Sequence, residues 1–386
     1  MKNKLASIIL WSVISAAFIG PGTVATAVSA GSRFQLDLLW TVVFATIACI
    51  IIQETAARIT ISSGLNLGQA FRMKFGDRWG RVFQFSIGWI VIIGCAAFEA
   101  GNFAGAAEGL GLVLNTNQSS IIVVISIAAA LLLWLDRPYW ISGIMLLLVG
   151  LMGIAFIILA QSHHYSATQL LGKIVSPSFP MGSGLVMLGL MGTTIVPYNI
   201  FLGSGISQQQ TIPLMRIGLI SSVLLGGLVT AFILVAGTAV TDFTTFNELT
   251  LAFSKETGSA GVFALAAGLF GAGFSSSVAA PYAASIIASS VFGWKGWKLV
   301  LVYFIVILTG VIFSIGNVKP VQLIISVQAL NGIILPLVIF FLITIVNDKK
   351  IVPQQHQPGI LYNGLLILIF IVVLIISIYQ VLRYLA

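Results

Sequence analysis

Apolar stretches of about twenty residues, nearly free of charged side chains, follow one another along the whole chain. Only 7% of the 386 residues are Asp, Glu, Lys or Arg, whereas a soluble domain carries about 25%. A stretch of this length crosses the hydrocarbon core of a bilayer as a helix. The sequence therefore predicts an all-α integral membrane protein and excludes a water-soluble globule.

Eleven such stretches predict eleven membrane-spanning helices. Their expected ranges are 6–31, 37–60, 80–112, 119–135, 139–161, 183–207, 214–240, 259–293, 297–316, 321–347 and 360–384. The polar connections 161–181 and 241–258 are expected to be loops, and 65–81 is expected to contain an interfacial helix. No soluble domain fits between the spans, so residues 1–386 are interpreted as one transmembrane domain.

The basic residues lie between the apolar runs, so the net charge of +8 does not indicate nucleic acid as a partner. With a cytoplasmic N-terminus, thirteen of the eighteen Lys and Arg residues fall on the cytoplasmic side, as the positive-inside rule requires. We expect a bacterial-type plasma-membrane protein with its C-terminus outside. Its expected partners are the lipid bilayer and a small ion or small molecule, and no pattern defines an oligomeric state.

The first apolar run is interrupted by Gly-Pro-Gly-Thr at residues 20–23. Glycine and proline at mid-span favour local unwinding of a helix. Unwound backbone is tolerated at membrane depth only where it lines a cavity or is packed in protein. Gly20 and Thr23 are therefore candidate substrate-binding residues.

The sixth run contains a second interruption, around Pro197. Aligning the two runs pairs Pro21 with Pro197 and Thr23 with Asn199. Two interrupted helices at corresponding places in two halves of a sequence point to the binding site of a transporter. The further candidate binding residues are Thr193, Thr194, Val196, Tyr198, Asn199 and, in the tenth span, Gln328.

The two interrupted spans each open a set of five, at about 6–161 and 183–347. An odd number of spans in each set gives the second set the opposite orientation in the membrane. The sequence therefore predicts a ten-helix inverted repeat whose first and sixth helices unwind near the bilayer midplane, with 360–384 as an additional eleventh helix.

Four segments in chain order match motifs of one transporter family. They are GPGTVATAVSAGSRFQLDLLW in the first span, IIQETAARITISSGLNLGQAFR in the second, AGLFGAGFSSSVAAPYAAS in the eighth and SVQALNGIILP in the tenth. These segments resemble the NRAMP divalent-metal transporters over most of the chain. The resemblance implies the LeuT fold and secondary transport, by alternating access, of a metal cation as the default substrate.

The resemblance also implies a metal site at the breaks, but the ligand positions differ. The family's Asp and Asn correspond to Gly20 and Thr23, and its Met-Pro-His corresponds to Val196, Pro197 and Tyr198. Without the thioether, selection of softer metals should be lost, and without the carboxylate an entering dication meets only neutral oxygen donors. We therefore assign no metal ligand and expect that the usual manganese or iron site is lost.

Acidic residues inside the spans are costly and mark candidate functional positions. Glu99 and Asn102 in the third span align with the family's proton route, which makes them candidate coupling or cation residues; a structural acid, protonated or paired, is the alternative. Glu54 and Arg58, one turn apart, are expected to pair and snorkel to the interface. Ser275–Ser277 in the eighth span are read as packing or cation-contacting residues.

Two other functions stay open. One is a same-fold transporter of a non-metal solute such as an amino acid, whose carboxylate a half-helix N-terminus could receive. The other is a non-transporting membrane sensor. The sequence contains no Walker A motif, HExxH motif or Ser-His-Asp candidate, so we expect neither an enzyme nor a cofactor.

Overall fold

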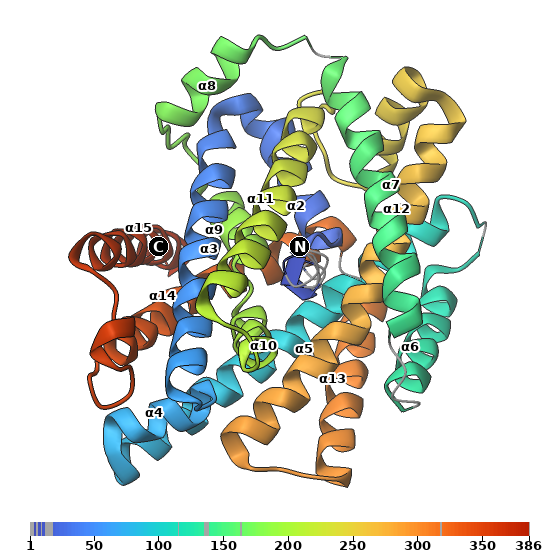
Figure 1. Cartoon of the computed structure of the whole chain (residues 1–386). Helices are drawn as coiled ribbons and strands as arrows, with labels where there is room; N and C mark the ends of the chain where they lie inside the picture. The colour runs from blue at the N-terminus through green and yellow to red at the C-terminus, as the bar shows by residue number, and fades with distance from the viewer. Residues whose placement is uncertain are drawn as a thin grey trace.

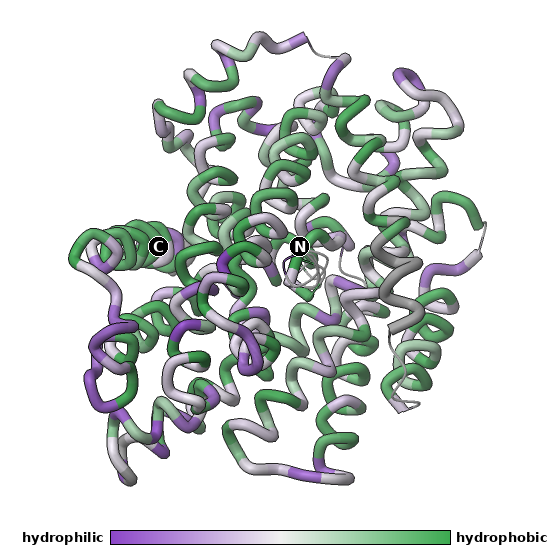
Figure 2. The backbone as a smooth tube through the Cα atoms, viewed as in Figure 1, coloured by the Kyte–Doolittle hydropathy of each residue, from purple (hydrophilic) through white to green (hydrophobic). Residues whose placement is uncertain are grey.

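The computed structural model describes residues 4, 7–8, 10–11, 18–114, 116–134, 139–162, 164–316 and 319–385. These residues form a bundle of helices, and no strand occurs among them (Figure 1). Hydrophobic residues dominate the helices, while hydrophilic residues gather mainly in the connections at the ends of the bundle (Figure 2). This distribution fits a protein whose outer surface faces lipid.

Ten of the expected spans coincide with helices, and the described part of the first span contains another. The helices of the spans are α2 (Pro21–Phe34), α3 (Leu39–Ser63), α5 (Arg81–Gly111), α6 (Gln118–Trp134), α7 (Tyr139–Gln161), α9 (Gly184–Thr194), α10 (Pro197–Ser207), α11 (Ile212–Gly237), α12 (Phe246–Phe292), α13 (Trp297–Ile315), α14 (Pro320–Val346) and α15 (Ile360–Leu385). Among the described residues, eight helical segments are long and apolar enough to cross a membrane. The short segments η1 (Gln35–Leu38), η2 (Gly76–Gly80) and η3 (Gln354–His356) lie in connections.

The expectation of loops at 161–181 and 241–258 is wrong. The first connection contains helix α8 (Ala167–Val175), which lies at one end of the bundle (Figure 1). The second contains the first turns of α12. Both helices start with a capping box, Ser166 with Gln169 and Thr245 with Glu248. Reciprocal side-chain bonds to the free N–H groups let these short polar sequences begin a helix.

A similar short helix follows the second span of each predicted half. In the first half it is α4 (Leu67–Phe75), which begins at a capping box and is followed by Gly76, with φ of 74°. In the second half it is the first part of α12, which ends at Gly258, with φ of 67°. Only glycine adopts this left-handed conformation readily. The correspondence supports the predicted repeat and confirms a helix within 65–81.

The interrupted helices lie in the middle of the bundle, where α2, α9 and α10 are surrounded by the longer helices (Figure 1). Close approach depends on small residues, as it does in many membrane proteins. A Cβ atom on Gly273 of α12 would lie 2.8 Å from the backbone oxygen of Asn102 on α5. A Cβ atom on Gly192 of α9 would lie 2.0 Å from the backbone oxygen of Gln328 on α14.

Glu54 and Arg58 form the expected ion pair at 2.5 Å, but they do not snorkel to the interface. Their exposed fractions are only 4% and 6%. Arg216 of α11 also contacts the Glu54 carboxylate at 2.8 Å, and the Tyr362 hydroxyl of α15 donates to it over 2.6 Å. Arg58 further donates to the backbone oxygen of His356. Burial is stable here because every charge has close partners.

Candidate functional site at the two helix breaks

The first break lies immediately before α2. Gly20 has extended backbone angles, φ of −124° and ψ of −176°, and Pro21 begins the helix. Proline suits this first position because it has no N–H group to leave unpaired. The Thr23 hydroxyl donates a hydrogen bond to the backbone oxygen of Phe18 across the break. The structure therefore confirms that the helix is interrupted at the predicted motif.

The second break separates α9 from α10. Helix α9 ends at Thr194, Ile195 and Val196 are not helical, and Pro197 begins α10. Both breaks thus end in a proline at the first position of the next helix, as the alignment of Pro21 with Pro197 predicts.

The two breaks meet in space. The hydroxyl oxygens of Thr23 and Thr193 lie 2.8 Å apart, although 170 positions separate them in the sequence. The neighbouring Thr194 hydroxyl instead donates to the backbone oxygen of Leu190 within α9. Thr23 and Thr193 therefore join the two interrupted helices, while the side chain of Thr194 stays within its own helix.

Two further helices contribute side chains to the first break. A Cβ atom on Gly22 would lie only 2.0 Å from Nε2 of Gln328, so the amide of this α14 residue rests directly on the backbone of α2. A Cβ atom on Gly20 would lie 3.4 Å from Oγ of Ser276 on α12. The sequence analysis assigned Ser276 either to helix packing or to a cation contact. In the structure it faces Gly20, the position at which the family has its Asp.

Several polar atoms around the breaks have no hydrogen-bond partner among the described residues. They are the side-chain nitrogen and oxygen of Asn199, Oε1 of Gln328, Oγ of Ser276 and the Tyr198 hydroxyl. Burying such a group without a partner costs about 1–3 kcal/mol. A cluster of unpaired donors and acceptors beside two helix breaks is therefore a candidate binding site for a polar or charged solute.

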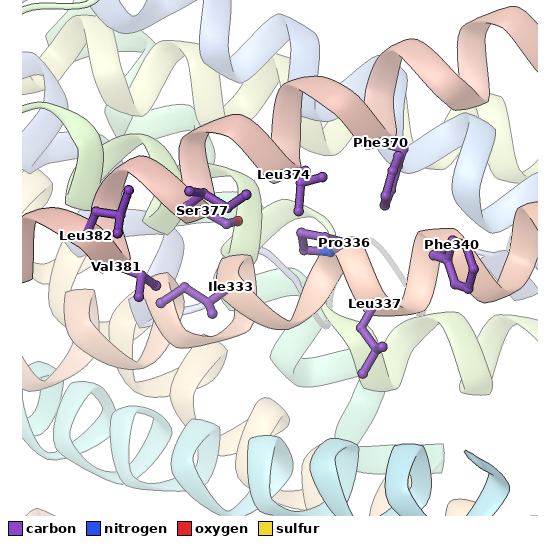
Figure 3. A pocket seen from close by; sticks show the side chains of 10 residues that line it. Ile333, Pro336, Leu337, Phe340, Phe370, Leu374, Ser377, Val381 and Leu382 are labelled. Carbon is purple, nitrogen blue, oxygen red and sulfur yellow. The ribbon is translucent and has the colours of Figure 1, made fainter. Parts of the chain in front are cut away.

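The described side chains of the candidate site are buried. Thr23 and Thr193 are fully buried, and Thr194, Tyr198, Asn199 and Gln328 are at most 2% exposed. A large apolar groove lies elsewhere, between α14 and α15, and its wall includes Ile333, Pro336 and Phe370 (Figure 3). A solute can reach the breaks only if the surrounding helices move.

Glu99 and Asn102 form a separate polar pair on α5. The Asn102 amide donates to Oε2 of Glu99 over 3.2 Å, and Oε1 has no partner among the residues that the structure describes. A Cβ atom on Gly310 of α13 would lie 2.6 Å from Cγ of Glu99. Helix α5 touches the first break at Gly105, six residues later, which is about 9 Å along a helix. Glu99 therefore lies near the breaks without lining the contact between them.

The side chains at the family's Met and His positions do not offer soft or imidazole ligands. Val196 is fully buried and supplies only its backbone to the break. The Tyr198 ring packs edge-on against Phe98, with centroids 5.4 Å apart. Within the described ranges, no group of three or more His, Cys, Asp or Glu side chains could hold a metal ion.

Sequence reasoning missed one contact at the second break. The Cys49 thiol of α3 donates to the backbone oxygen of Thr194 over 3.3 Å. The break leaves this carbonyl without the proton donor of a continuous helix, because residue 198 no longer follows in helical register. No local pattern around Cys49 signals this contact, since its partner lies 145 positions away.

Comparisons with known proteins identify the family to which this chain belongs. The sequence profile of the family described as natural resistance-associated macrophage protein-like (Nramp) matches residues 12–383. The divalent metal cation transporter MntH of Verminephrobacter eiseniae is 30% identical over 71% of this chain and 66% of its own length. MntH of Bacillus subtilis is 26% identical over 88% of this chain and 83% of its own length.

Solved structures agree on the fold. A manganese transporter of Eremococcus coleocola superposes with a TM-score of 0.82 and 19% identity, over 98% of this chain and 86% of that one. A nucleobase-cation-symport-1 family transporter superposes with a TM-score of 0.61 and 15% identity, over 98% and 92% of the two chains. The expected LeuT-type architecture is thereby confirmed, and the chain belongs to the Nramp family.

Proposed function

We propose that this protein is a secondary transporter that carries a divalent metal cation across the membrane by alternating access around the breaks in α2 and α9–α10. The meeting of both breaks at Thr23 and Thr193, beside unpaired polar side chains, carries the proposal. The metal-transporting relatives support the substrate class. They do not favour an amino-acid transporter or a sensor.

The donor set suits a hard cation better than a soft one. The proposed binding residues are Gly20, Thr23, Thr193, Thr194, Val196, Tyr198, Asn199 and Gln328, together with Ser276. They offer amide, hydroxyl and backbone oxygens, which are ligands of Mg²⁺ and Mn²⁺ rather than of thiophilic metals. With no carboxylate in the set, binding should be weak, and the metal should keep part of its water shell.

Uptake by proteoliposomes tests this function. The wild-type protein should transport Mg²⁺ or Mn²⁺ and discriminate poorly against Ca²⁺. Gly20→Asp should raise the affinity for Mn²⁺ at least tenfold, because a Cβ atom at this position meets Ser276 at no less than 3.4 Å and the carboxylate adds a full negative charge. Gly20→Asn is the matched control, with the same shape and no charge.

The metal proposal fails if neither calorimetry nor flux detects a divalent cation in the wild-type protein and in Gly20→Asp. An equal gain in Gly20→Asp and Gly20→Asn would contradict the electrostatic reason given for it. Asn199→Ala should abolish saturable uptake, since it removes an unpaired amide beside the break.

Glu99 is the proposed coupling residue, with Asn102 as its hydrogen-bond partner. It is fully buried, and one carboxylate oxygen is unpaired among the described residues. Glu99→Gln should abolish stimulation of uptake by a pH gradient while preserving binding. Glu108→Gln on the same helix, whose carboxylate accepts from Gln118 near the helix end, should retain the stimulation. Unchanged proton stimulation in Glu99→Gln would remove Glu99 from the mechanism.

In the proposed cycle, the halves at about 6–161 and 183–347 supply the helices that move, and 360–384 lies outside the repeat. The excess of basic residues on one side supports a cytoplasmic N-terminus and an outer C-terminus in a bacterial plasma membrane.

A further inference from the structure

A second apolar groove lies on the outside of the bundle, between α6 and α13. It encloses about 150 Å³. Its wall on α6 is formed by Ala130, Leu133 and Trp134, the last turn of that helix, and its wall on α13 by Val300, Phe304 and Ile307. Tyr303 also faces it. Because both helices belong to predicted membrane spans, the groove opens toward the acyl chains of the bilayer.

Two lysines stand at the end of α13 where this groove begins. Lys298 lies two residues before the groove-lining Val300, and Lys295 lies in the preceding turn. Both are exposed, and neither forms an ion pair with any part of the chain that the structure describes. Among the described residues, the groove therefore has an apolar body and, at one end, two lysines without an ion-pair partner.

Two tryptophans flank the same end of the groove. Trp297 is 71% exposed and Trp134 is 69% exposed. Tryptophan concentrates at the level of lipid headgroups, because its ring is apolar and its N–H group is polar. Their positions put Lys295 and Lys298 at headgroup depth, with the groove running from there into the hydrocarbon.

We propose that the groove between α6 and α13 binds an anionic phospholipid, with an acyl chain along the groove and the headgroup phosphate at Lys295 and Lys298. Basic sites between spans recognise anionic headgroups in this way. An acyl chain seated in the groove shields the apolar groove wall from the mobile acyl chains of the surrounding lipids. The two lysines then select the charge of the headgroup. This binding is separate from transport at the helix breaks.

The groove between α14 and α15 provides a natural comparison (Figure 3). It is larger, about 470 Å³, and its described lining is apolar except for Ser377. The Ser377 hydroxyl is engaged with the backbone of Val373 and so offers little to a headgroup. Because none of its lining residues is charged, this groove should select headgroup charge less strongly than the α6–α13 groove.

Lipid titration of the full-length protein tests the proposal. The thermal midpoint is measured in nanodiscs of phosphatidylcholine alone and of phosphatidylcholine mixed with phosphatidylglycerol, and lipid affinity is measured by native mass spectrometry. Phosphatidylglycerol should bind preferentially and raise the midpoint. Replacing both Lys295 and Lys298 by Gln should lower its affinity about 30-fold, at roughly fivefold for each lysine.

The matched control is the double replacement of Lys255 and Lys319 by Gln. These exposed lysines precede the eighth and tenth spans, at the opposite end of α12 and α13. The control should keep the preference for phosphatidylglycerol. Equal losses in both double variants would overturn the proposal, because they would reflect total charge rather than a site.

A second pair of variants tests the groove itself. Ala130→Phe fills the α6–α13 groove and should weaken phosphatidylglycerol binding, whereas Leu337→Phe in the α14–α15 groove should not. Glycerol phosphate tests the headgroup alone and should not reproduce the stabilisation. Full stabilisation by glycerol phosphate, or unchanged lipid binding in Ala130→Phe, would overturn the proposed acyl-chain site.

Discussion

Gly105 shows how little space separates the first break from its neighbours. A Cβ atom at this position of α5 would lie 2.0 Å from Cβ of Pro21. The proline ring is rigid and begins α2, so it cannot turn aside as a long side chain could. Gly101, one turn earlier on α5, meets nothing closer than 3.7 Å. Close packing against Pro21 therefore requires a glycine at position 105, whereas no such contact requires one at position 101.

Gly105→Ala should reduce both stability and transport. Overpacking of a rigid contact costs about 1–3 kcal/mol, and displacement of Pro21 would also separate Thr23 from Thr193. Gly101→Ala is the control, and its better helix propensity should leave stability equal or slightly higher. Thermal unfolding and initial uptake rates are measured side by side. Similar behaviour of the two variants would show that the break tolerates movement of Pro21.

The sequence predicts many of the residues around the candidate site, but it does not predict which of them contact one another. The prolines and glycines of both breaks identify the unwound segments, because few other features explain them in a membrane span. The contacts of Ser276 with Gly20 and of Cys49 with Thr194 join distant segments through packing. A single serine or cysteine in a helix has no spacing that reveals such a partner.

At the scale of helices, the charge cluster around Glu54 fastens α15 to the repeat. Glu54 lies on α3, Arg216 on α11 and Tyr362 on α15, so one carboxylate joins three helices. The sequence predicted the local pair with Arg58 from its spacing. It could not predict burial, because the covering groups come from positions more than 150 residues away.

Tyr362→Phe should destabilise the protein by about 1.5–3 kcal/mol, the usual worth of a hydrogen bond to a charged group. The variant keeps the ring that packs over Arg58 and removes only the hydroxyl. Tyr379→Phe on the same helix is the control, because Tyr379 is 56% exposed. Thermal unfolding in one detergent measures both. A loss in Tyr379→Phe as large as that in Tyr362→Phe would argue against a specific tie.

A second tie joins α4 to the connection between α14 and α15. Lys74 donates to the Asp348 carboxylate over 2.7 Å. The hydrogen bond from Lys74, assisted by the backbone N–H of Lys350, lowers the pKa of Asp348. The resulting stabilisation is present above the ordinary Asp pKa of about 3.9 and is lost as the pH falls through the lowered value.

Asp348→Asn should therefore lower the unfolding temperature slightly at pH 7. The difference from wild type should shrink below about pH 4 and in high salt, because both side chains are partly exposed. Glu256→Gln removes an exposed acid that has no ion pair among the described residues, and it should show no such pH dependence. A difference that stays constant from pH 7 to pH 3 would exclude the ion pair as its cause.

At the scale of the whole molecule, hydropathy and the two breaks predict most of the architecture. The spans, the inverted repeat and the added eleventh helix follow from apolar run length and from the position of the prolines. Helix α8 and the first turns of α12 were missed, because a capping box among polar residues is a weaker signal than a run of twenty apolar ones. The family resemblance supplied the LeuT fold.

The orientation of the chain is a property of the whole charge pattern and is testable directly. Fusion of alkaline phosphatase to the C-terminus should give an active enzyme in a bacterial host, because this end is expected outside. Fusion of a green fluorescent protein that folds only in the cytoplasm should stay dark there. The same pair of reporters fused after residue 347, before the eleventh span, should give the reverse result. Cytoplasmic fluorescence from the C-terminal fusion would contradict the proposed topology.

The Cys49 thiol donates a hydrogen bond to the backbone oxygen of Thr194, which the break leaves without a helical partner. This thiol is therefore an intrinsic infrared probe of the second break. The S–H stretching vibration absorbs in an infrared window where other protein groups are nearly silent, and its frequency reports the strength of the bond that the thiol donates. Movement of α3 away from α9 should shift this band. With Cys95 as the only other thiol in the chain, difference spectra could follow opening of the break in the unlabelled protein during a single turnover.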